Sequence, residues 1–585
     1  MKCCFLVGFL VGPLAAFSLV IVIASGCEKS GAGYHPPTAA VASAASKQSA
    51  PAANPSIDNV AAADDAASAQ PATSAIGTEA LAPEEGASGA VRSEPGASEI
   101  TAPAATAAEL DSEAANLQTS EGKKKPFDPI EENGKYFEGW PRPKLALVIT
   151  GHQDGYLEPC GCAGLENQKG GLSRRQSFFQ QLAQRGWPLA AVDVGGLVRR
   201  FGKQAELQFA VSAEALKTMG YNAVGFGPAD LRLSVGDIVA AVASATPADS
   251  IFVSANVNLF GLTPKVRTVE IGGMKIGITS VLGKEYQAQV NNSEVEFHPA
   301  AESLEKVLPE LKDCNVRILL ANATLAETKA LAVRFPVFHL VVTADGADVP
   351  PAQPEEIGKT HARLIEVGHK GMYAVVVGFY DDPKHPLRFQ RVALDSRFPN
   401  SEPMKQLMVE YQGQLRSLGW EGLGLRAVPA PEAKKGNKLA GKFVGAANCK
   451  ACHEAAWDVW AASKHAHATD TLTRIDPPRQ FDPECISCHA TGWNPQENIP
   501  YVSGFESVEK TPQLVANSCE NCHGPGAAHV AAEKATDASA REAARELLKL
   551  HWPAAKESVC LKCHDHDNSP EFDANAEKYW SEIVH

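Results

Sequence analysis

The C-terminal quarter of the chain repeats one short motif four times, and this repeat limits the possible folds more than any other feature. The motif is Cys-x-x-Cys-His, and its four copies consist of Cys449/Cys452/His453, Cys485/Cys488/His489, Cys519/Cys522/His523 and Cys560/Cys563/His564. Eight of the 14 cysteines and ten of the 17 histidines therefore lie after residue 448 of the 585. We expect a domain organised around thiol and imidazole groups at this end of the chain.

The spacing within the motif predicts covalently bound haem. Two thiols three positions apart on one helical turn can both form thioethers to the vinyl groups of a haem, and the next histidine then lies beneath the iron as its proximal ligand. Zinc sites and disulfides do not require a histidine at the fifth position in every copy. The sequence therefore predicts four covalently bound haem c groups.

Counting residue types limits which side chains can serve as the second axial ligand of each iron. All six methionines lie at or before Met408, so no haem of this domain has a local methionine ligand. Bis-histidine or five-coordinate iron remains, and bis-imidazole ligation favours low reduction potentials. The histidines left over in this region are His465, His467, His529, His551, His566 and His585.

Residues 443–585 resemble the cytochrome c-554 family of tetrahaem cytochromes. The resemblance rests on segments around the motifs, among them Phe443-Val-Gly-Ala-Ala-Asn-Cys449, Ser463-Lys-His-Ala-His467 and Cys522-His-Gly-Pro-Gly526. It implies a mainly α-helical electron-transfer domain with stacked haem pairs, three bis-histidine haems and one haem, the second in sequence, without a distal protein ligand.

Carried over to this sequence, the resemblance also implies a pairing of ligands. His465 would reach the haem of His564, His529 that of His453, and His585 that of His523, which leaves an open iron on His489. His467 is a rival to His465, because both lie on one short helical stretch and the family pattern does not choose between them.

The middle of the chain alternates short apolar runs with amphipathic stretches, which predicts an α/β fold with a largely buried sheet. Strands are expected at 145–150, 189–194, 222–226, 251–256, 275–281, 316–321 and 338–342. Helices are expected at 171–185, 203–219, 301–311 and 324–332. Residues 367–380 and 387–394 suggest a closing antiparallel hairpin, and a further helix is expected over 401–420.

Residues 145–394 resemble the calcineurin-like metallophosphoesterases of the 5'-nucleotidase type. The motifs include Gly170-Gly-Leu-Ser-Arg-Arg175, Asp193-Val-Gly-Gly196 and Val253-Ser-Ala-Asn256. The resemblance implies an α/β four-layer sandwich with a dinuclear metal site at the strand ends.

The ligand positions of that metal site are largely lost from this sequence. Gly195-Gly196, Pro228-Ala229 and Ala344 to Ala347 stand where ligand motifs are expected, and glycine, alanine and proline side chains bind no metal. His152, Asp154, Asp193, Asn322 and Asp345 remain as candidates. We expect a binding or scaffold domain without its metal site. For Cys160 and Cys162 three roles are left open, namely a disulfide, a redox pair or a metal-binding pair.

The N-terminus carries an export signal. An apolar run over residues 5–23 is followed by Ala24-Ser25-Gly26-Cys27, which resembles the lipobox of bacterial lipoproteins. Lipidation of Cys27 is expected, and an uncleaved signal anchor is the alternative. Either places the protein on the periplasmic side of a bacterial membrane. The next segment is rich in Ala, Ser and Pro, which predicts a disordered tether.

The net charge of −14 argues against nucleic acid as a partner.

The predicted layout has five parts, namely a signal peptide (1–26), a tether (27–140), a phosphoesterase-like domain (141–398), a helix and linker (399–442) and a tetrahaem domain (443–585). The expected function is electron transfer between redox protein partners by a membrane-tethered cytochrome. One alternative is a haem enzyme that reduces or oxidises a small nitrogen compound at an open iron. A second alternative is a metal-dependent phosphoesterase with a haem domain. Electron transfer is favoured over enzymatic activity.

Overall fold

Two β-sheets lie face to face in the middle of the chain. The computed structural model describes residues 127–160, 167–431, 439–569 and 571–585. The first sheet has the strand order β15-β14-β1-β4-β5. Its strands are β1 (Leu145–Thr150), β4 (Leu189–Asp193), β5 (Ala223–Val224), β14 (Tyr373–Phe379) and β15 (Leu387–Ala393). β1 pairs in parallel with β4 and antiparallel with β14, and β14 and β15 form the expected hairpin.

The second sheet has the strand order β12-β13-β11-β10-β8-β7. Its strands are β7 (Arg267–Ile271), β8 (Met274–Leu282), β10 (Val316–Asn322), β11 (Leu340–Thr343), β12 (Glu355–Ile357) and β13 (Ala362–Glu366). β8, β10, β11 and β13 are parallel, while β7 and β12 close the edges in the antiparallel sense. Two short ladders join β2 (Pro159–Cys160) to β3 (Lys169–Gly170) and β6 (Val257–Asn258) to β9 (Glu296–Phe297).

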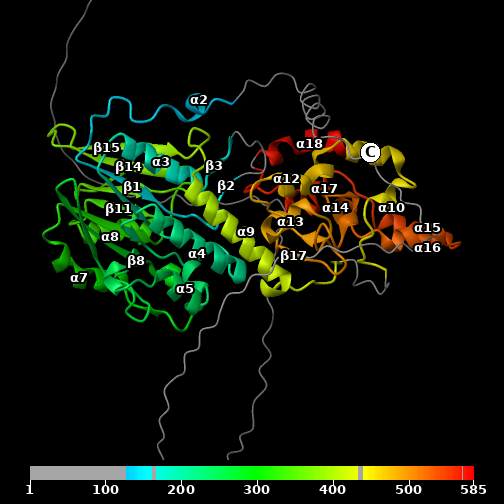
Figure 1. Cartoon of the computed structure of the whole chain (residues 1–585), viewed down its shortest axis with the longest axis horizontal. Coiled ribbons are helices and arrows are strands. Elements are labelled where there is room, and N and C mark those ends of the chain that lie inside the picture. The colour runs from blue at the N-terminus through cyan, green and yellow to red at the C-terminus, as the bar shows by residue number, and fades with distance from the viewer. Residues whose placement is uncertain (1–126, 161–166, 432–438, 570) are drawn as a thin grey trace, which may run out of the picture. The chain divides into compact units, whose positions relative to one another are not determined.

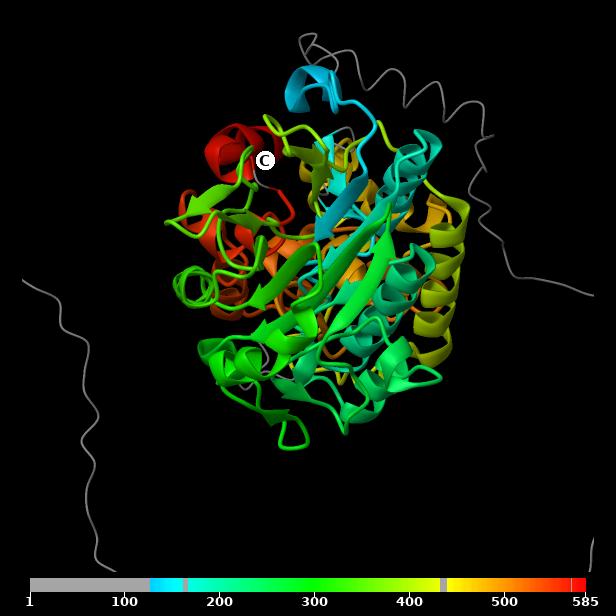
Figure 2. The same ribbon diagram turned by 90° about the vertical axis from the view of Figure 1, so that its left-hand side faces the viewer.

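Helices cover the outer face of each sheet (Figures 1 and 2). The helices and helical turns of this domain are α3 (Leu172–Gln184), α4 (Lys203–Thr218), η2 (Asp230–Arg232), α5 (Val235–Val242), η3 (Pro247–Asp249), α6 (Lys284–Gln287), α7 (Ala300–Leu311) and α8 (Leu325–Arg334). Side chains of a strand alternate between its two faces. In β1, Leu147 and Ile149 therefore join the core between the sheets, whereas Ala146 and Val148 join the core under α3, α4 and α5.

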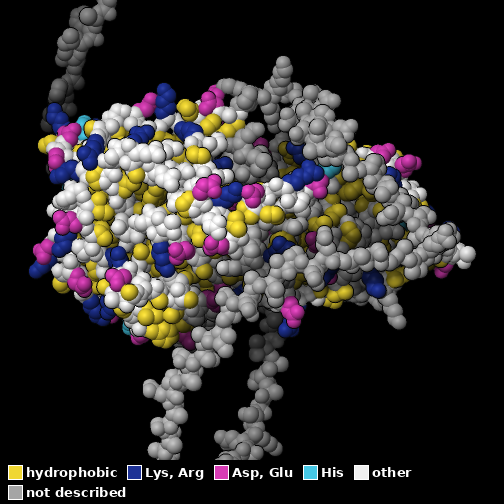
Figure 3. Space-filling model, viewed as in Figure 1, with side chains coloured by type: hydrophobic (Ala, Val, Ile, Leu, Met, Phe, Trp, Pro, Cys, Tyr) yellow, Lys and Arg dark blue, Asp and Glu magenta, His cyan; other side chains and the backbone are white. Residues whose placement is uncertain are grey.

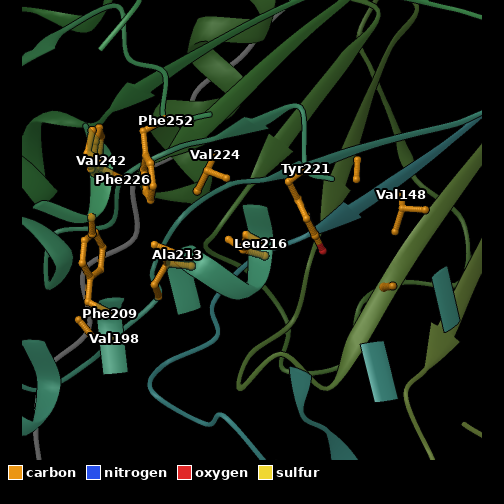
Figure 4. Close-up of a cluster of buried hydrophobic side chains, with 14 of the residues drawn as sticks. Val148, Val198, Phe209, Ala213, Leu216, Tyr221, Val224, Phe226, Val242 and Phe252 are labelled. Atoms are coloured by element: carbon orange, nitrogen blue, oxygen red, sulfur yellow. The ribbon is translucent and has the colours of Figure 1, made fainter. Parts of the chain in front are cut away.

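A third core lies under α7 and α8 on the other side of the second sheet. Helix, sheet, sheet and helix thus form the four layers of the expected α/β sandwich. Figure 4 shows part of the core under α4, where Phe252 lies against Phe226 with ring centroids 5.2 Å apart and against Phe209 at 5.9 Å.

The folded part begins earlier than the expected boundary at residue 140. Helix α2 (Pro129–Asn133) is capped by Asp128, whose carboxylate accepts a hydrogen bond from the Ile130 backbone N–H at 2.8 Å. Phe137 is buried, with its ring 5.2 Å from those of Trp140 and Trp187. Residues 128–140 therefore belong to the phosphoesterase-like domain, because three aromatic side chains anchor them to it.

The segment 251–256 is not a strand, although its composition favours one. It keeps a single bridge, from Phe252 to Val224 of β5. The Asn256 side chain donates to the Leu282 and His298 backbone oxygens at 2.8 and 3.1 Å. These side-chain hydrogen bonds replace ladder hydrogen bonds and end the pairing.

Helix α9 (Glu402–Gly422) confirms the predicted helix and packs against α3 and α4. Met404, Met408, Tyr411 and Leu415 are buried along one side of it. Phe481, from the region of the repeated motifs, packs against the same cluster. The helix therefore joins the sandwich to the start of the C-terminal domain.

The C-terminal domain is built of short helices and turns, as expected. They are α10 (Ala447–Lys450), α11 (Glu454–Ala461), η5 (Lys464–His467), α12 (Ala468–Arg474), α13 (Pro483–His489), η6 (Pro512–Leu514), α14 (Cys519–His523), α15 (Ala527–Lys534), α16 (Ala538–Glu546), α17 (Ala554–Ser558), η7 (Cys560–Lys562) and α18 (Phe572–Ile583), with a small hairpin of β16 (Trp493–Asn494) and β17 (Ile499–Pro500). Its apolar core is small and is formed around Leu472, Ile486, Trp493, Phe505 and Leu514.

Across residues 127–585, apart from the segments outside the described ranges, no helix is both long enough and apolar enough to span a bilayer. The signal segment 1–26, Cys27, the tether up to residue 126 and Cys162 lie outside the described residues.

Candidate haem-binding site

Each repeated motif folds into a tight turn that carries its histidine next to its cysteines. The His453 backbone N–H donates to the Cys449 oxygen, and that of His564 donates to the Cys560 oxygen, both at 2.9 Å. The second motif forms α13, whose first turn is capped by the Asp482 carboxylate. The third forms α14, which Ser518 and Asn521 cap reciprocally. A cap of this kind satisfies the free N–H groups of a short helix.

Three of the four motif histidines face a second histidine from elsewhere in the domain. The ring centroids of His453 and His529 are 6.2 Å apart, those of His465 and His564 are 5.9 Å apart, and those of His523 and His585 are 5.7 Å apart. These are the pairs that the sequence comparison implied.

The spacing of these rings suits one metal ion between each pair. A metal–imidazole bond is about 2 Å long, and the centre of the ring lies roughly 1 Å beyond the bonded nitrogen. Two imidazoles on opposite sides of one ion therefore have centroids roughly 6 Å apart. In the described residues no group of three or more His, Cys, Asp or Glu side chains gathers as a metal site. Two axial ligands for each iron are what a haem requires from the protein.

Hydrogen bonds at Nδ1 orient the motif histidines. His489 Nδ1 donates to the Ala468 backbone oxygen at 2.8 Å, and His523 Nδ1 donates to that of Leu548 at 2.7 Å. His564 Nδ1 lies 3.0 Å from the Ser569 hydroxyl. A backbone carbonyl only accepts, so Nε2 of His489 and His523 keeps the lone pair with which neutral imidazole binds a metal.

Burial keeps these imidazoles neutral. It lowers the pKa of His489 and of His523, and together with the neighbouring His465 it lowers the pKa of His564 to about 4. Neutral imidazole is the form that binds a metal.

The remaining histidines do not form such pairs. The His467 side chain is 63% exposed and lies 3.5 Å from the Asp470 carboxylate, while His551 and His566 are exposed. His465, not its rival His467, is the one that faces His564. Within the described part of the chain, no second histidine ring pairs with His489 in the way that the other three motif histidines are paired.

The thiols bring the motifs together in two sets. The Cys449 thiol interacts with that of Cys519, as Cys488 does with Cys563. The first motif therefore lies beside the third, and the second beside the fourth. The stacked haem pairs that the resemblance implies remain a prediction.

Cys452 differs from the other seven motif cysteines in its surroundings. It is exposed, whereas the other seven are half-buried. His453 beside it is exposed as well. The thioether bonds of all eight motif cysteines to haem remain a prediction from the motif.

Glu520, inside the third motif, ties it to the first, a role that the sequence analysis missed. The carboxylate accepts hydrogen bonds from the backbone N–H groups of Val444, Gly445 and Gly526, at 2.7 Å for the two glycines. Burial raises the pKa of Glu520. Its position between Cys519 and Cys522 was the available signal, because a carboxylate buried inside a motif needs several donors.

This part of the chain is similar to a known family of cytochromes. The family model described as cytochrome c554 and c-prime matches residues 448–524. The cytochrome c-554 of Nitrosomonas europaea is 28% identical over 168 residues, which cover 25% of this chain and 69% of that protein. The C-terminal domain resembles cytochrome c-554. The expectation from the sequence is confirmed for this c-554-like domain.

Solved structures similar to the chain include two phosphoesterases. The 5'-nucleotidase precursor of Thermus thermophilus is 20% identical, with a TM-score of 0.39 over 47% of this chain and 59% of that one. The calcineurin-like phosphoesterase YfkN of Bacillus subtilis is 12% identical, with a TM-score of 0.36 over 47% of this chain and 98% of that one. This chain thus spans about three fifths of the Thermus protein's length.

Within the described residues, the side chains at the strand ends of the phosphoesterase-like domain do not form a dinuclear metal site. The resemblance implied a ligand motif at Gly195 and Gly196, and a Cβ added to Gly196 would lie 2.7 Å from Cδ2 of His152. Asn322 donates to the Val194 oxygen at 3.3 Å, and Asp345 accepts from the Leu325 N–H at 2.7 Å. These side chains serve the fold, so the residues present do not fit two bridged cations.

Asp193 is also engaged elsewhere. Its carboxylate and the Arg175 guanidinium are both fully buried, 3.6 Å apart. It accepts a hydrogen bond from the Thr150 hydroxyl at 2.6 Å, and burial raises its pKa.

Of the two cysteines whose role was left open, Cys160 ends β2, and Cys162 lies outside the described residues. Cys314 is buried in the core.

Proposed function

We propose that the chain is an exported electron-transfer protein whose c-554-like domain carries four covalently bound haem c groups. The main support for this proposal is the set of three facing imidazole pairs, whose ring centroids are 5.7 to 6.2 Å apart. Such pairs support bis-histidine irons of low reduction potential. When bound, the haem supplies reversible one-electron redox chemistry.

The residues of each motif have distinct roles in this proposal. The two cysteines anchor the haem through thioethers, and the motif histidine is the proximal ligand. His529, His465 and His585 are the distal ligands opposite His453, His564 and His523. Hydrogen bonds to Nδ1 hold the proximal rings and leave Nε2 for the iron.

The partners in this proposal are a redox protein that donates electrons and one that accepts them. The protein would act on the periplasmic side of a bacterial membrane, held there by lipid on Cys27 or by a signal anchor. The Ala- and Pro-rich segment would serve as the tether, and the phosphoesterase-like domain as a scaffold.

A redox titration of the full chain, followed by absorption and low-temperature electron paramagnetic resonance (EPR) spectroscopy, tests this function. Four haems by mass, low potentials and three low-spin bis-histidine signals are expected. A preparation with fewer than four thioether-bound haems, or with no low-spin signal, would contradict it.

A second function is suggested by His489, whose ring faces no second histidine within the described residues. An open iron there would bind and reduce or oxidise a small nitrogen compound. Adding nitric oxide or carbon monoxide to the reduced protein tests this idea. A spectral change of one haem in four supports it, whereas four unchanged six-coordinate spectra exclude it.

A further inference from the structure

The fourth motif is held from outside its own domain. Asp567, three residues after His564, accepts a hydrogen bond from Arg199 Nη1 at 2.7 Å and one from Lys370 Nζ at 2.7 Å. Lys370 Nζ also donates to the Asp567 backbone oxygen at 3.3 Å. Burial works against the charged form, but the hydrogen bonds and charges of Lys370 and Arg199 lower the pKa of Asp567 to about 2. The carboxylate is therefore charged at every physiological pH.

Both cations belong to the phosphoesterase-like domain, at the edge where its family would hold metals. The Tyr156 ring lies between them, 4.9 Å from the Arg199 guanidinium and 5.2 Å from the Lys370 ammonium. The Lys370 backbone N–H donates to the Asp154 carboxylate at 3.1 Å, and the Gly371 N–H donates to the His152 oxygen at 2.8 Å. Two of the former ligand candidates thus position the lysine.

The lysine of this contact is buried, as are the arginines of the Arg175–Asp193 and Arg479–Glu158 ion pairs. Figure 3 shows basic and acidic side chains mixed over one face, where exposed ion pairs contribute about 0–1 kcal/mol each. The Lys370 side chain is only 7% exposed. Removing the partner of a buried charge is costly, so the Lys370 ammonium favours a conformation in which it contacts Asp567.

Asp567 lies within a short loop whose two ends meet at the proximal histidine. The Ser569 backbone N–H donates to the Asp565 oxygen at 2.8 Å, which closes the loop. The Ser569 hydroxyl lies 3.0 Å from His564 Nδ1, and the Phe572 ring stacks on the His564 ring at 4.4 Å. Holding the middle of this loop therefore fixes the groups that orient the imidazole.

The second motif is anchored to the same domain. Gln204 of α4 donates to the Asp482 carboxylate at 2.8 Å, and Gln208 donates to that of Glu484 at 3.1 Å. Arg479 forms an ion pair with Glu158. The set formed by the second and fourth motifs is thus the one that these contacts join to the sandwich.

We propose that Arg199 and Lys370 of the phosphoesterase-like domain are positioning residues for the fourth haem site, acting through Asp567 on the orientation of His564. In this proposal, the edge of the phosphoesterase-like domain where its family would hold metals binds the loop that follows the haem ligand His564. The inference rests on the proposed haem ligation and goes beyond it by giving the second domain a part in electron transfer.

The test uses the full chain with its haems and compares Asp567→Asn, Lys370→Met and the double variant. All three are expected to keep four haems and to change the low-spin EPR signal of one and the same haem. The double variant is expected to change that signal no more than either single variant, because the two residues act as one unit. Asp567→Glu, which keeps the charge, should restore much of the native signal.

Asp381→Asn is the matched control, since Asp381 pairs with Lys144 at 2.9 Å in an exposed ion pair of the same domain. It should leave all four signals unchanged. A purely electrostatic role would shift the potential of that haem upward in Asp567→Asn and downward in Lys370→Met with unaltered EPR signals, and this would overturn the positioning role. Unchanged signals and potentials in both variants would overturn it as well.

Failure of the proposed function looks different. In that case the unaltered protein itself would lack four haems or their low-spin signals. If Asp567→Asn does not mature, Lys370→Met carries the test, because Lys370 lies outside the haem domain.

Discussion

A histidine that donates from Nδ1 to a backbone carbonyl has only Nε2 left to bind a metal. His489 and His523 are held in this way, by Ala468 and Leu548. The carbonyls come from segments 21 and 25 positions away, so the tertiary fold rather than the motif sets the ring orientation. At the scale of single residues, the motif provides the histidine, and hydrogen bonds from the surrounding fold set the orientation of its ring.

His585 is the proposed distal ligand that is simplest to test. Replacing His585 by Ala removes the ring that faces His523 at 5.7 Å but leaves every cysteine in place. We expect four haems by mass and one new high-spin signal by EPR, because one distal ligand is lost while both thioethers remain.

His467→Ala is the control for this variant, since His467 is exposed and faces Asp470. It should leave the four signals as they are. A low-spin spectrum in His585→Ala identical to that of the unaltered protein would refute the assignment of His585.

The choice between His465 and His467 shows what the sequence could not decide. Both histidines lie on the single turn η5, and each is two residues from the other. Which of them faces His564 depends on how that turn is placed against a segment about one hundred positions later. The pattern Lys-His-Ala-His contains no information on this placement, and the resemblance left the same choice open while it implied the pairs His453/His529 and His523/His585.

At the scale of elements, a buried carboxylate connects the loops that follow β4 and β5. Asp230 of η2 accepts backbone hydrogen bonds from Gly196, Gly227 and Val198 at 2.8 to 3.0 Å. Burial nevertheless raises its pKa to about 7, so burial outweighs the three donors. The loops after β4 and β5 are therefore joined by a group that titrates near neutrality.

This predicts a pH-dependent stability that Asp230→Asn removes. A raised pKa in the folded state means that the contribution is fully present below the unfolded-state pKa of about 4 and is lost as the pH rises through about 7. The unaltered protein should lose stability relative to the variant over this range. Urea unfolding followed by circular dichroism, at several pH values, measures the difference. A difference that stays constant with pH would contradict the shift.

The elements themselves were predicted best where burial is two-sided. The strands at 145–150 and 316–321 are continuous apolar runs between a second sheet and a helix layer, and the structure forms them at nearly the same bounds. The segment 251–256 has similar composition, but the Asn256 N–H donates to the Ser254 hydroxyl and the Asn256 side chain accepts from the distant Leu282 N–H in place of a continuous ladder. A hydrophobic run predicts burial, and only the polar side chains within it decide whether a strand forms.

At the scale of the whole molecule, a phosphoesterase-like sandwich without its ligands should not hydrolyse phosphoesters with metal. Incubating the full chain with Mn²⁺ and a nucleotide should give no turnover above the metal-free rate. The reason is that Gly196 and the engaged Asn322 and Asp345 offer no converging ligands. Metal-stimulated turnover that disappears in Asp154→Asn would contradict this prediction.

The α/β sandwich and the helical region of the repeated motifs could be predicted from the sequence pattern, but the contacts between them could not. Arg199, Lys370 and Asp567 are ordinary surface-type residues in the sequence, and nothing near them indicates a partner 197 or 368 positions away. Long-range ion pairs leave no local pattern. The start of the fold at Asp128 was missed for a related reason, because Phe137 and Trp140 pack on a distant Trp187.

The long separation between Arg199 and Asp567 has a consequence for the order of assembly. A chain is made from its N-terminus, and domains generally fold as units in that order. The sandwich is complete before the fourth motif emerges, so the last haem loop closes onto a surface that already exists. Closing a contact over 368 positions between two unfolded segments would cost far more entropy than docking a loop on a finished domain. In this order of synthesis, the sandwich would present a folded surface to the loop of the fourth motif.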